Sequence, residues 1–187
     1  MTLHRTIRVC VTGAECSGKT TLARDLARRF EAPLVEEYGR EYFARKIATG
    51  DATVFPGDLV RVIGEQSRRE DLVASKHPDL MICDTDVFTV AVWHERFLGG
   101  RRPEIELLAD MRCDEGAGMD LYFLCVPDFP FVPDEIRTGE PLRTAMHEVF
   151  VRKLAEKNCP YVELQGPHEG RLAKASAEIQ RLLLSEA

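Results

Sequence analysis

Five short runs of apolar and β-branched residues are spaced along the chain, and stretches with helical spacing separate them. Short apolar runs predict buried strands, whereas apolar residues at intervals of three and four predict amphipathic helices. The predicted strands are Ile7–Thr12, Pro33–Val35, Leu80–Cys83, Leu121–Val126 and Tyr161–Leu164. Strands that alternate with helices in this way indicate an α/β fold with a five-stranded parallel sheet.

Helical spacing is clear near the C-terminus, where the segments from Leu142 to Leu154 and from Leu172 to Leu182 each carry an apolar stripe. Proline, glycine and capping residues bound the other predicted helices. These cover Tyr38–Ala48, Pro56–Ser75, Val87–Phe97 and Pro103–Met111, and a further helix carries Leu22, Ala23, Leu26, Ala27 and Phe30. In contrast, three prolines between Pro127 and Pro133 exclude a regular helix and predict a shaped loop.

Length and composition fit one domain that comprises residues 1–187. The net charge of −6 argues against nucleic acid or an anionic membrane as the main partner. The N-terminus lacks an apolar signal core and no apolar run approaches the length of a membrane span, so we expect a soluble, cytoplasmic protein. The six cysteines form no C-x-x-C pair, which fits a reducing environment. The sequence leaves the oligomeric state open.

The most specific motif follows the first predicted strand. Residues 13–20 read G-A-E-C-S-G-K-T, a complete G-x-x-x-x-G-K-[ST] phosphate-binding loop between a strand and a helix. Backbone N–H groups and the helix N-terminus favour bound phosphate oxygens there. We expect Lys19 to reach the terminal phosphates of a nucleotide and the Thr20 hydroxyl to help hold Mg²⁺. The predicted nucleotide-binding residues are Gly13, Ala14, Glu15, Cys16, Ser17, Gly18, Lys19, Thr20 and Thr21.

Carboxylates follow the second and third predicted strands, at the edge of an open α/β sheet where ligands bind. Asp84 ends an apolar run, which is typical of a carboxylate that orients Mg²⁺ or its water ligands. The alternative for Asp84 is a helix N-cap, which would still allow Asp86 to be the reactive group. Glu36 and Glu37 are candidates for the general base that receives the proton of an acceptor hydroxyl. Two adjacent carboxylates cannot both point inward from a helix, so Glu37 is preferred and Asp86 remains an alternative.

Aromatic residues accompany these acids and suggest a pocket for a flat ring, especially a cationic one. Trp93 is either part of this pocket or a core residue. The predicted acceptor-binding residues are Glu36, Tyr38, Arg40, Tyr42, Asp84, Trp93 and Asp128. On the donor side, Gly166 and Pro167 follow the last predicted strand and are expected to lie against the base of the nucleotide.

Arg137 and Arg143 bracket the turn-like segment Thr138–Pro141. The arginine side chain stays ionised and binds phosphoryl oxygens bidentately, so both arginines are candidates for stabilising developing charge. The segment from roughly residue 128 to residue 144 is therefore predicted to form a lid that excludes water when it closes. The alternative is that both arginines simply lie on the surface.

Together these motifs resemble the ribosylnicotinamide kinase domain of the bifunctional bacterial regulators of NAD biosynthesis, with related stand-alone P-loop ATPases and kinases. The resemblance covers nearly the whole chain. It rests on Gly13–Leu22, Glu37–Tyr42, Cys83–Asp86 with Thr89 and Trp93, and Asp128 with Val132, Pro133, Asp134 and Arg137. It implies a P-loop NTPase fold of the nucleoside-kinase type with ATP and Mg²⁺ as cofactors. It also implies phosphorylation of the 5′-hydroxyl of nicotinamide riboside to nicotinamide mononucleotide.

The chain departs from the full-length regulators in two ways. It contains no H-x-G-H site, so we expect no adenylyl transfer. Phe131 and the segment 133–136 also stand where the family commonly carries a tryptophan and paired acids followed by glycine. The sequence therefore leaves open a P-loop kinase of another nucleoside or small metabolite, and a nucleotide-dependent regulatory ATPase switch. The lack of an N-K-x-D guanine motif favours ATP over GTP.

Overall fold

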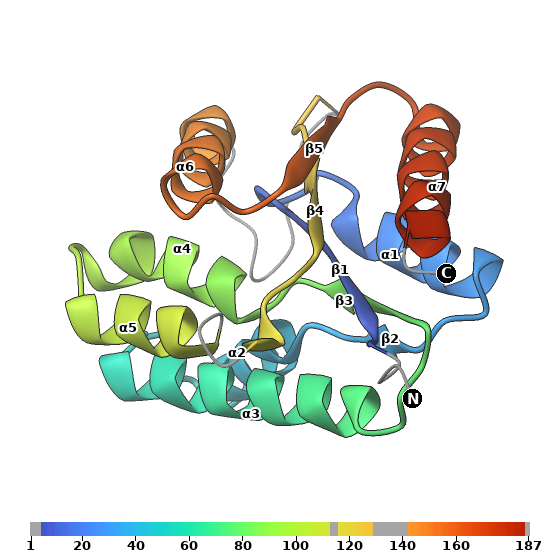
Figure 1. The fold of residues 1–187 in the computed structure, drawn as a ribbon. Coiled ribbons are helices and arrows are strands. Elements are labelled where there is room, and N and C mark those ends of the chain that lie inside the picture. The colour runs from blue at the N-terminus through green and yellow to red at the C-terminus, as the bar shows by residue number, and fades with distance from the viewer. Residues whose placement is uncertain (1–4, 113–115, 129–141, 186–187) are drawn as a thin grey trace.

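The computed structural model describes residues 5–112, 116–128 and 142–185 and contains one sheet of five parallel strands (Figure 1). The strands are β1 (Ile7–Gly13), β2 (Leu34–Val35), β3 (Leu80–Asp84), β4 (Leu121–Cys125) and β5 (Tyr161–Leu164). The helices are α1 (Lys19–Arg29), α2 (Tyr38–Ala48), α3 (Pro56–Ala74), α4 (Val87–Leu98), α5 (Pro103–Arg112), α6 (Arg143–Glu156) and α7 (His168–Ser185). The predicted α/β fold is confirmed, and the boundaries predicted for the strands lie within one residue of those observed.

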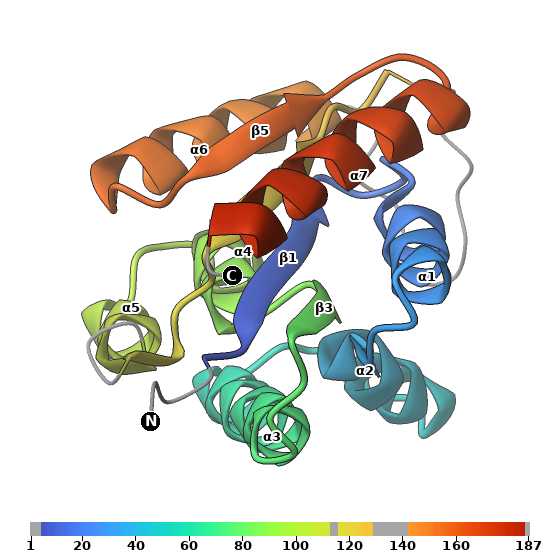
Figure 2. The same ribbon diagram turned by 45° about the vertical axis from the view of Figure 1, so that its right-hand side comes forward.

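Helices cover both faces of the sheet (Figures 1 and 2). One face packs against α1 and α7, whereas the other packs against α4 and α6 and against α3 near β2 and β3. The alternation of side chains along β1 fits this arrangement, because Val9 and Val11 contact the first layer and Cys10 contacts the second. Burial on both faces explains why the strands are continuous apolar runs.

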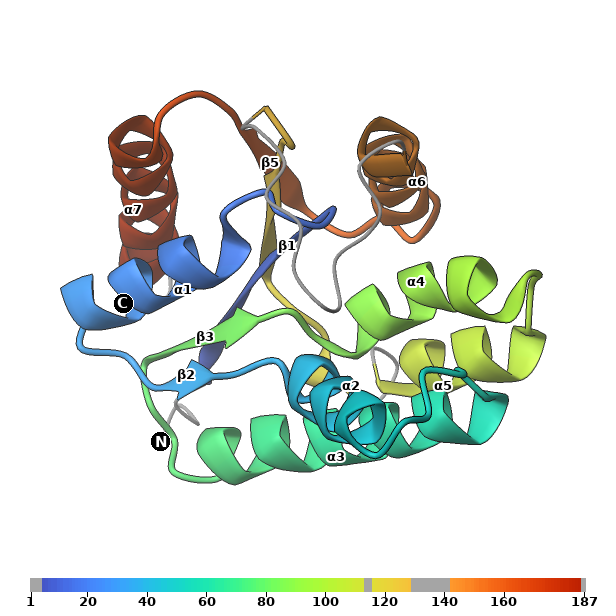
Figure 3. The ribbon, with the colours of Figure 1, turned by 180° about the vertical axis from the view of Figure 1, so that it is seen from behind.

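The carboxyl ends of the five strands share one edge of the sheet. The strand order is β2-β3-β1-β4-β5, so β1 lies in the middle, and the order reverses direction between β1 and β3. The backbone N–H of Thr85, just after β3, donates to the carbonyl of Val11 in β1 at 3.0 Å. Figure 3 shows the chain leaving β2 and β3 towards α2 and α4, which frame this edge of the sheet. Such a reversal is where open α/β sheets bind ligands.

The predicted lid lies mostly outside the described residues. Of the segment from residue 128 to residue 144, the structure describes Asp128 and residues 142–144, and Arg137 lies outside it. In the described ranges, no helix has both the length and the apolar character needed to cross a bilayer. That residues 1–187 form a single domain stays a prediction.

A polar cluster is buried between α3 and the sheet. The Tyr122 hydroxyl donates to Asp86 at 2.7 Å, and the Arg112 guanidinium lies 3.5 Å from the Glu70 carboxylate. Burial, together with the charge of Asp86, raises the pKa of Glu70 from 4.5 to about 8, although Arg112 acts in the opposite direction. Glu70 is therefore mainly protonated in the folded protein at neutral pH.

This cluster predicts that the free energy of unfolding falls as the pH rises from about 4.5 to about 8. The unfolded chain releases the Glu70 proton at the ordinary pKa, while the folded chain keeps it until the raised pKa, so rising pH favours the unfolded state in this window. One such proton gives a slope of up to about 1.4 kcal/mol per pH unit. Glu70→Gln should reduce this slope, as measured by urea denaturation at several pH values. An equal slope in both proteins would contradict the assignment.

Candidate active site

The loop between β1 and α1 has the backbone geometry of a phosphate cradle. Gly13 and Gly18 have φ angles of 137° and 82°, which glycine adopts without steric cost. A Cβ atom on Gly13 would lie 2.7 Å from the carbonyl oxygen of Cys125, at the end of β4. Cys16 also has a positive φ, of 50°. The loop therefore curls closely against β4 before α1 begins, and the free N–H groups of the first turn of α1 face the cradle.

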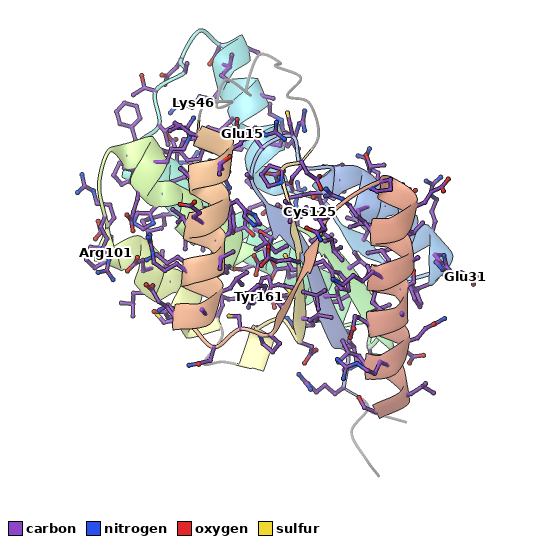
Figure 4. The ribbon with its side chains drawn as sticks, turned by 90° about the horizontal axis from the view of Figure 1, so that it is seen from above. Glu15, Glu31, Lys46, Arg101, Cys125 and Tyr161 are labelled. Carbon is purple, nitrogen blue, oxygen red and sulfur yellow. The ribbon has the colours of Figure 1, made fainter. Side chains whose placement is uncertain are left out.

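The side chains of the loop support the same interpretation. Lys19 Nζ donates to the carbonyl of Ala14 at 2.8 Å, and Ser17 Oγ donates to the same oxygen at 2.8 Å. These bonds hold the Lys19 ammonium across the loop, where it can exchange the carbonyl for a phosphate oxygen. Thr21 is exposed on the first turn of α1, whereas Glu15 lines the pocket described below. Figure 4 shows Glu15 beside the start of α6.

Asp84 and Thr20 form the candidate metal site. The Thr20 hydroxyl is hydrogen-bonded to the Asp84 carboxylate, which is buried at the end of β3. Desolvation raises the pKa of Asp84, while Thr20 and the charge of Lys19 oppose this rise. Oδ1 of Asp84 has no hydrogen-bond partner among the described residues. A buried oxygen without a partner is unfavourable, and a carboxylate beside a hydroxyl is a donor set that suits Mg²⁺.

A pocket opens beside the phosphate-binding loop and is lined by α2, α3 and α4. Lys19 lines it from the loop, and Glu37 and Arg40 line it from the start of α2. Glu37 occupies the N-cap position of α2 with an extended backbone, and its carboxylate does not cap the helix. The same pocket is therefore lined by a carboxylate and by the lysine of the phosphate-binding loop, the two kinds of group that a general base near a terminal phosphate requires.

Aromatic rings line another part of the pocket. Trp93 and Phe97 of α4 stack with their ring centroids 5.6 Å apart and their planes at 26°, and the Phe43 ring of α2 lies 6.2 Å from Phe97. Of these three rings, only that of Trp93 is predicted from the sequence. Phe97 follows Trp93 by four residues and so lies on the same face of α4, which is the signal that points to it. The three rings give the pocket an apolar surface suited to a flat ligand.

Gln66 of α3 connects the pocket to the sheet. Its Oε1 accepts a hydrogen bond from the N–H of Tyr38 at 3.0 Å, and its Nε2 donates to the carbonyl of Thr85 at 3.5 Å. Thr85 has a φ angle of 64°, which is uncommon for a β-branched residue and marks backbone strain next to the pocket. Gln66 is a polar residue within the apolar stripe of α3, three residues after Ile63. This interruption of the stripe is the sequence feature that points to it.

The structure corrects two of the predicted carboxylates. The side chain of Glu36 is 63% exposed and pairs with Arg24 at 3.1 Å, so it points away from the pocket. Asp86 is 4% exposed and caps α4 by accepting from the N–H of Thr89 at 2.9 Å, while its other oxygen accepts from Tyr122. Its oxygens are occupied within the core, so Asp86 serves helix capping and is not placed to act as a general base.

Three further residues predicted to bind the acceptor have structural partners instead. The Tyr42 hydroxyl donates to Asp58 at 2.6 Å, and the Arg69 guanidinium lies 4.6 Å from the centre of the Tyr38 ring. These contacts fasten α2 to α3, and neither tyrosine lines the pocket. Asp128 accepts a hydrogen bond from the N–H of Gly166 at 2.6 Å. It therefore belongs to the loops after β4 and β5, on the side predicted for the nucleotide.

Arg143 lies at the start of α6 and is buried against the phosphate-binding loop. Its Nη2 donates to the carbonyl of Cys16 at 3.1 Å. This contact places the Arg143 cation against the phosphate-binding loop, and its role near the phosphates stays a prediction. Gly166, with a φ angle of 81°, and Pro167 follow β5 at the same edge of the sheet.

A second group of possible metal ligands, His94, Glu95 and Glu106, does not form a metal site. His94 Nε2 accepts from the N–H of Arg102 at 2.8 Å, and Glu106 pairs with Lys153 at 2.8 Å. These partners use the atoms that a metal ion needs. Among the described residues, Asp84 and Thr20 are therefore the better candidates for holding a divalent cation.

Comparisons with known proteins agree with this geometry. The family described as the AAA domain matches residues 8–171. The trifunctional NAD biosynthesis/regulator protein NadR of Salmonella typhimurium is 24% identical over 178 residues, which are 94% of this chain and 42% of that protein. The chain thus spans about two fifths of the length of this relative.

Solved structures show the same similarity. NadR protein in complex with NR gives a TM-score of 0.70 at 27% identity, over 95% of this chain and 52% of that one. NadR protein in complex with NAD and AMP-PNP gives 0.67 at 26% identity, over 94% of this chain and 49% of that one. Thymidylate kinase from Ehrlichia chaffeensis shares the fold, with a TM-score of 0.70 at 13% identity over 94% of this chain and 99% of that one.

The phosphate cradle lies in a fold that these solved structures share. The P-loop kinase fold and the resemblance stated from the motifs are confirmed. The chain belongs to the family described as the AAA domain, and over most of its length it is similar to the NAD biosynthesis/regulator protein NadR.

Proposed function

We propose that the protein transfers the γ-phosphate of ATP to the 5′-hydroxyl of nicotinamide riboside, which gives nicotinamide mononucleotide and ADP. The observation that carries this proposal is the pocket in which Lys19, Glu37 and the ring of Trp93 meet. Aromatic faces and a carboxylate both attract a flat cationic ring, and the nicotinamide ring of the riboside carries a positive charge. The similarity to NadR protein in complex with NR supports the same acceptor.

In the proposed reaction, the acceptor oxygen forms a bond to the γ-phosphorus while the bond from this phosphorus to the β,γ-bridging oxygen breaks, and ADP leaves. Glu37 orients the acceptor hydroxyl and receives its proton. Lys19 and the N–H groups of the loop stabilise the charge on the phosphoryl oxygens, and Arg143 adds a cation above the loop. Positioning and charge stabilisation contribute most to this class of reaction.

Thr20 and Asp84 are the residues that would hold Mg²⁺. The fit rests on Oδ1 of Asp84, which is buried and has no hydrogen-bond partner in the described part of the chain. When bound, the ion would supply positive charge that neutralises phosphate oxygens. Asp84 is therefore proposed as a metal-side residue, and direct contact with the acceptor is not needed for this role.

The acceptor is tested by measuring ADP formation with a panel of nucleosides. We expect nicotinamide riboside to stimulate turnover more than uncharged nucleosides do. Trp93→Leu should lower kcat/KM for nicotinamide riboside about 3- to 30-fold, the range of a cation–π contact, while Trp93→Phe retains more of it. Stimulation by uncharged nucleosides alone would contradict the proposal. Turnover that responds to no nucleoside would favour the regulatory switch.

The general base is tested by a pair of adjacent variants. Glu37→Gln should lower kcat about 100-fold or more, since general-base catalysis contributes on this order. Glu36→Gln is the matched control, because Glu36 has the same chemistry but points towards Arg24, and its kcat should stay within about twofold, as expected for a surface ion pair. Single-turnover kinetics separate the chemical step from product release. Equal losses in the two variants would exclude Glu37 as the specific base.

The metal-side role of Asp84 predicts a loss that depends on Mg²⁺. Asp84→Asn should reduce the gain in AMP-PNP affinity that Mg²⁺ produces by about tenfold or more, as for loss of a metal ligand, and it should have little effect on affinity in EDTA. Isothermal titration calorimetry at several Mg²⁺ concentrations measures this difference. Lys19→Ala is the comparison, because it should weaken binding with and without the metal. If Asp84→Asn keeps the full Mg²⁺ effect, the metal lies elsewhere.

A further inference from the structure

Arg171 of α7 is a charged side chain that is only 2% exposed. Arginine is rarely buried to this extent unless its donors are satisfied. Nη1 donates to the carbonyl of Ser17 at 3.0 Å, Nη2 to that of Val126 at 2.9 Å, and Nε to that of Gly166 at 2.9 Å. These carbonyls belong to the phosphate-binding loop, the segment after β4 and the segment after β5. One guanidinium therefore joins three loops at the carboxyl edge of the sheet.

Asp128 closes this arrangement. Its Oδ1 accepts a hydrogen bond from Arg171, and its Oδ2 accepts one from the N–H of Gly166 at 2.6 Å. The N–H of Gly166 is thus held by Asp128 and its carbonyl by Arg171, and these two residues form an ion pair. The N–H of Arg171 also donates to the carbonyl of Pro167 at 3.2 Å. We call Arg171, Asp128 and Gly166 the loop clamp.

A second contact fastens the same loop from the other end. His168 Nε2 lies 2.6 Å from the Asp25 carboxylate of α1, so the start of α7 is fixed to the helix that follows the phosphate-binding loop. The segment after β5 is therefore tied both to this loop and to its helix. Its position relative to the phosphate cradle is set by charged hydrogen bonds, which are stronger than neutral ones.

The loop clamp lies on the opposite side of the phosphate-binding loop from the acceptor pocket. Arg171 also contacts the Cys125 thiol, and the carbonyl of Cys125 is the atom against which Gly13 turns. Figure 4 shows Cys125 between α6 and α7. No residue of the clamp lines the acceptor pocket, which is built from α2, α3 and α4. The clamp therefore acts on the part of the site predicted for the nucleotide.

Only arginine has the geometry for this position. Its planar group has five N–H donors in a fixed fork, so it can serve carbonyls from three directions together with a carboxylate. An apolar residue of similar volume would leave these buried carbonyls without donors, and lysine would offer its donors from a single point. The Arg171 side chain thus fixes the distances between the loops and also provides hydrogen-bond donors to their buried carbonyls.

We propose that Arg171 is a positioning residue for the nucleotide donor. It sets the separation between the phosphate-binding loop and the loop at Gly166–Pro167, so that the triphosphate and adenosine parts of ATP bind at the same time. This inference rests on the proposed base-binding role of the Gly166–Pro167 loop, and it is independent of the identity of the acceptor. Its consequence is specific: loss of the fork weakens the contribution of adenosine more than that of the phosphates.

The test compares two ligands in the absence of acceptor. Arg171→Lys keeps the charge but loses the fork, and binding of AMP-PNP and of inorganic tripolyphosphate is measured by calorimetry. We expect AMP-PNP affinity to fall about tenfold or more, the effect of losing charged hydrogen bonds, while tripolyphosphate affinity falls less than about threefold. Arg112→Lys is the matched control. Arg112 is likewise largely buried and paired, with Asp71 at 2.8 Å, so this variant should lower the melting temperature without changing the ratio of the two affinities.

Equal losses for both ligands would show that Arg171 supports only the phosphate-binding loop, and would overturn the proposal. A lower melting temperature with both affinities unchanged would overturn it as well. Should Arg171→Lys fail to fold, Asp128→Asn breaks the charge pair from the other side and should weaken AMP-PNP binding selectively in the same way. A wild-type protein that binds AMP-PNP but is not stimulated by nicotinamide riboside would contradict the proposed acceptor and leave the role of Arg171 intact.

Discussion

The close approach of Gly13 to the carbonyl of Cys125 is the constraint on which the rest of the site depends. It forces the chain to turn at the end of β1, in the middle of the sheet, and so places the phosphate cradle between the ends of β3 and β4. Asp84 lies at the end of one neighbouring strand, and Val126, which Arg171 contacts, follows the other. Asp84 and the loop clamp therefore lie on two sides of the phosphate cradle. The central position of β1 in a parallel sheet is what makes this possible.

The sites proposed for the two substrates lie against different layers of the molecule. Helices α1 and α7 cover the face where Arg171 and His168 fix the loops near the proposed nucleotide site, whereas α2, α3 and α4 line the proposed acceptor pocket. Each layer contains a buried polar side chain that joins separate segments, Arg171 on the donor side and Gln66 on the acceptor side. Buried polar groups of this kind cost free energy unless every partner is in place, so they define loop positions more strictly than apolar contacts do.

The sequence was sufficient for the fold and the cradle because apolar periodicity and the G-x-x-x-x-G-K-[ST] motif report on local structure. Glu37 lines the pocket whereas the adjacent Glu36 pairs with Arg24, a difference that the sequence could not establish because adjacency in sequence does not set the direction of a side chain. The role of Glu37 as a base stays a prediction. The buried role of Arg171 was not predicted, because an arginine on an amphipathic helix is normally exposed. The sequence indicates Gln66 only weakly, as a polar residue within an apolar stripe. The predicted lid, which includes Arg137, lies largely outside the described residues.

One backbone angle sends the side chains of Asp84 and Asp86 in different directions and so gives them different roles. Along a regular strand, residues two apart point to the same face, which would send both carboxylates towards α1. Thr85 instead adopts a φ angle of 64°, so Asp84 meets Thr20 of α1 while Asp86 meets Tyr122 on the opposite face. The strain at Thr85 is offset by hydrogen bonds from its N–H to Val11 and from Gln66 to its carbonyl. The same turn thus leaves one carboxylate oxygen available for a cation and uses the other carboxylate to begin α4.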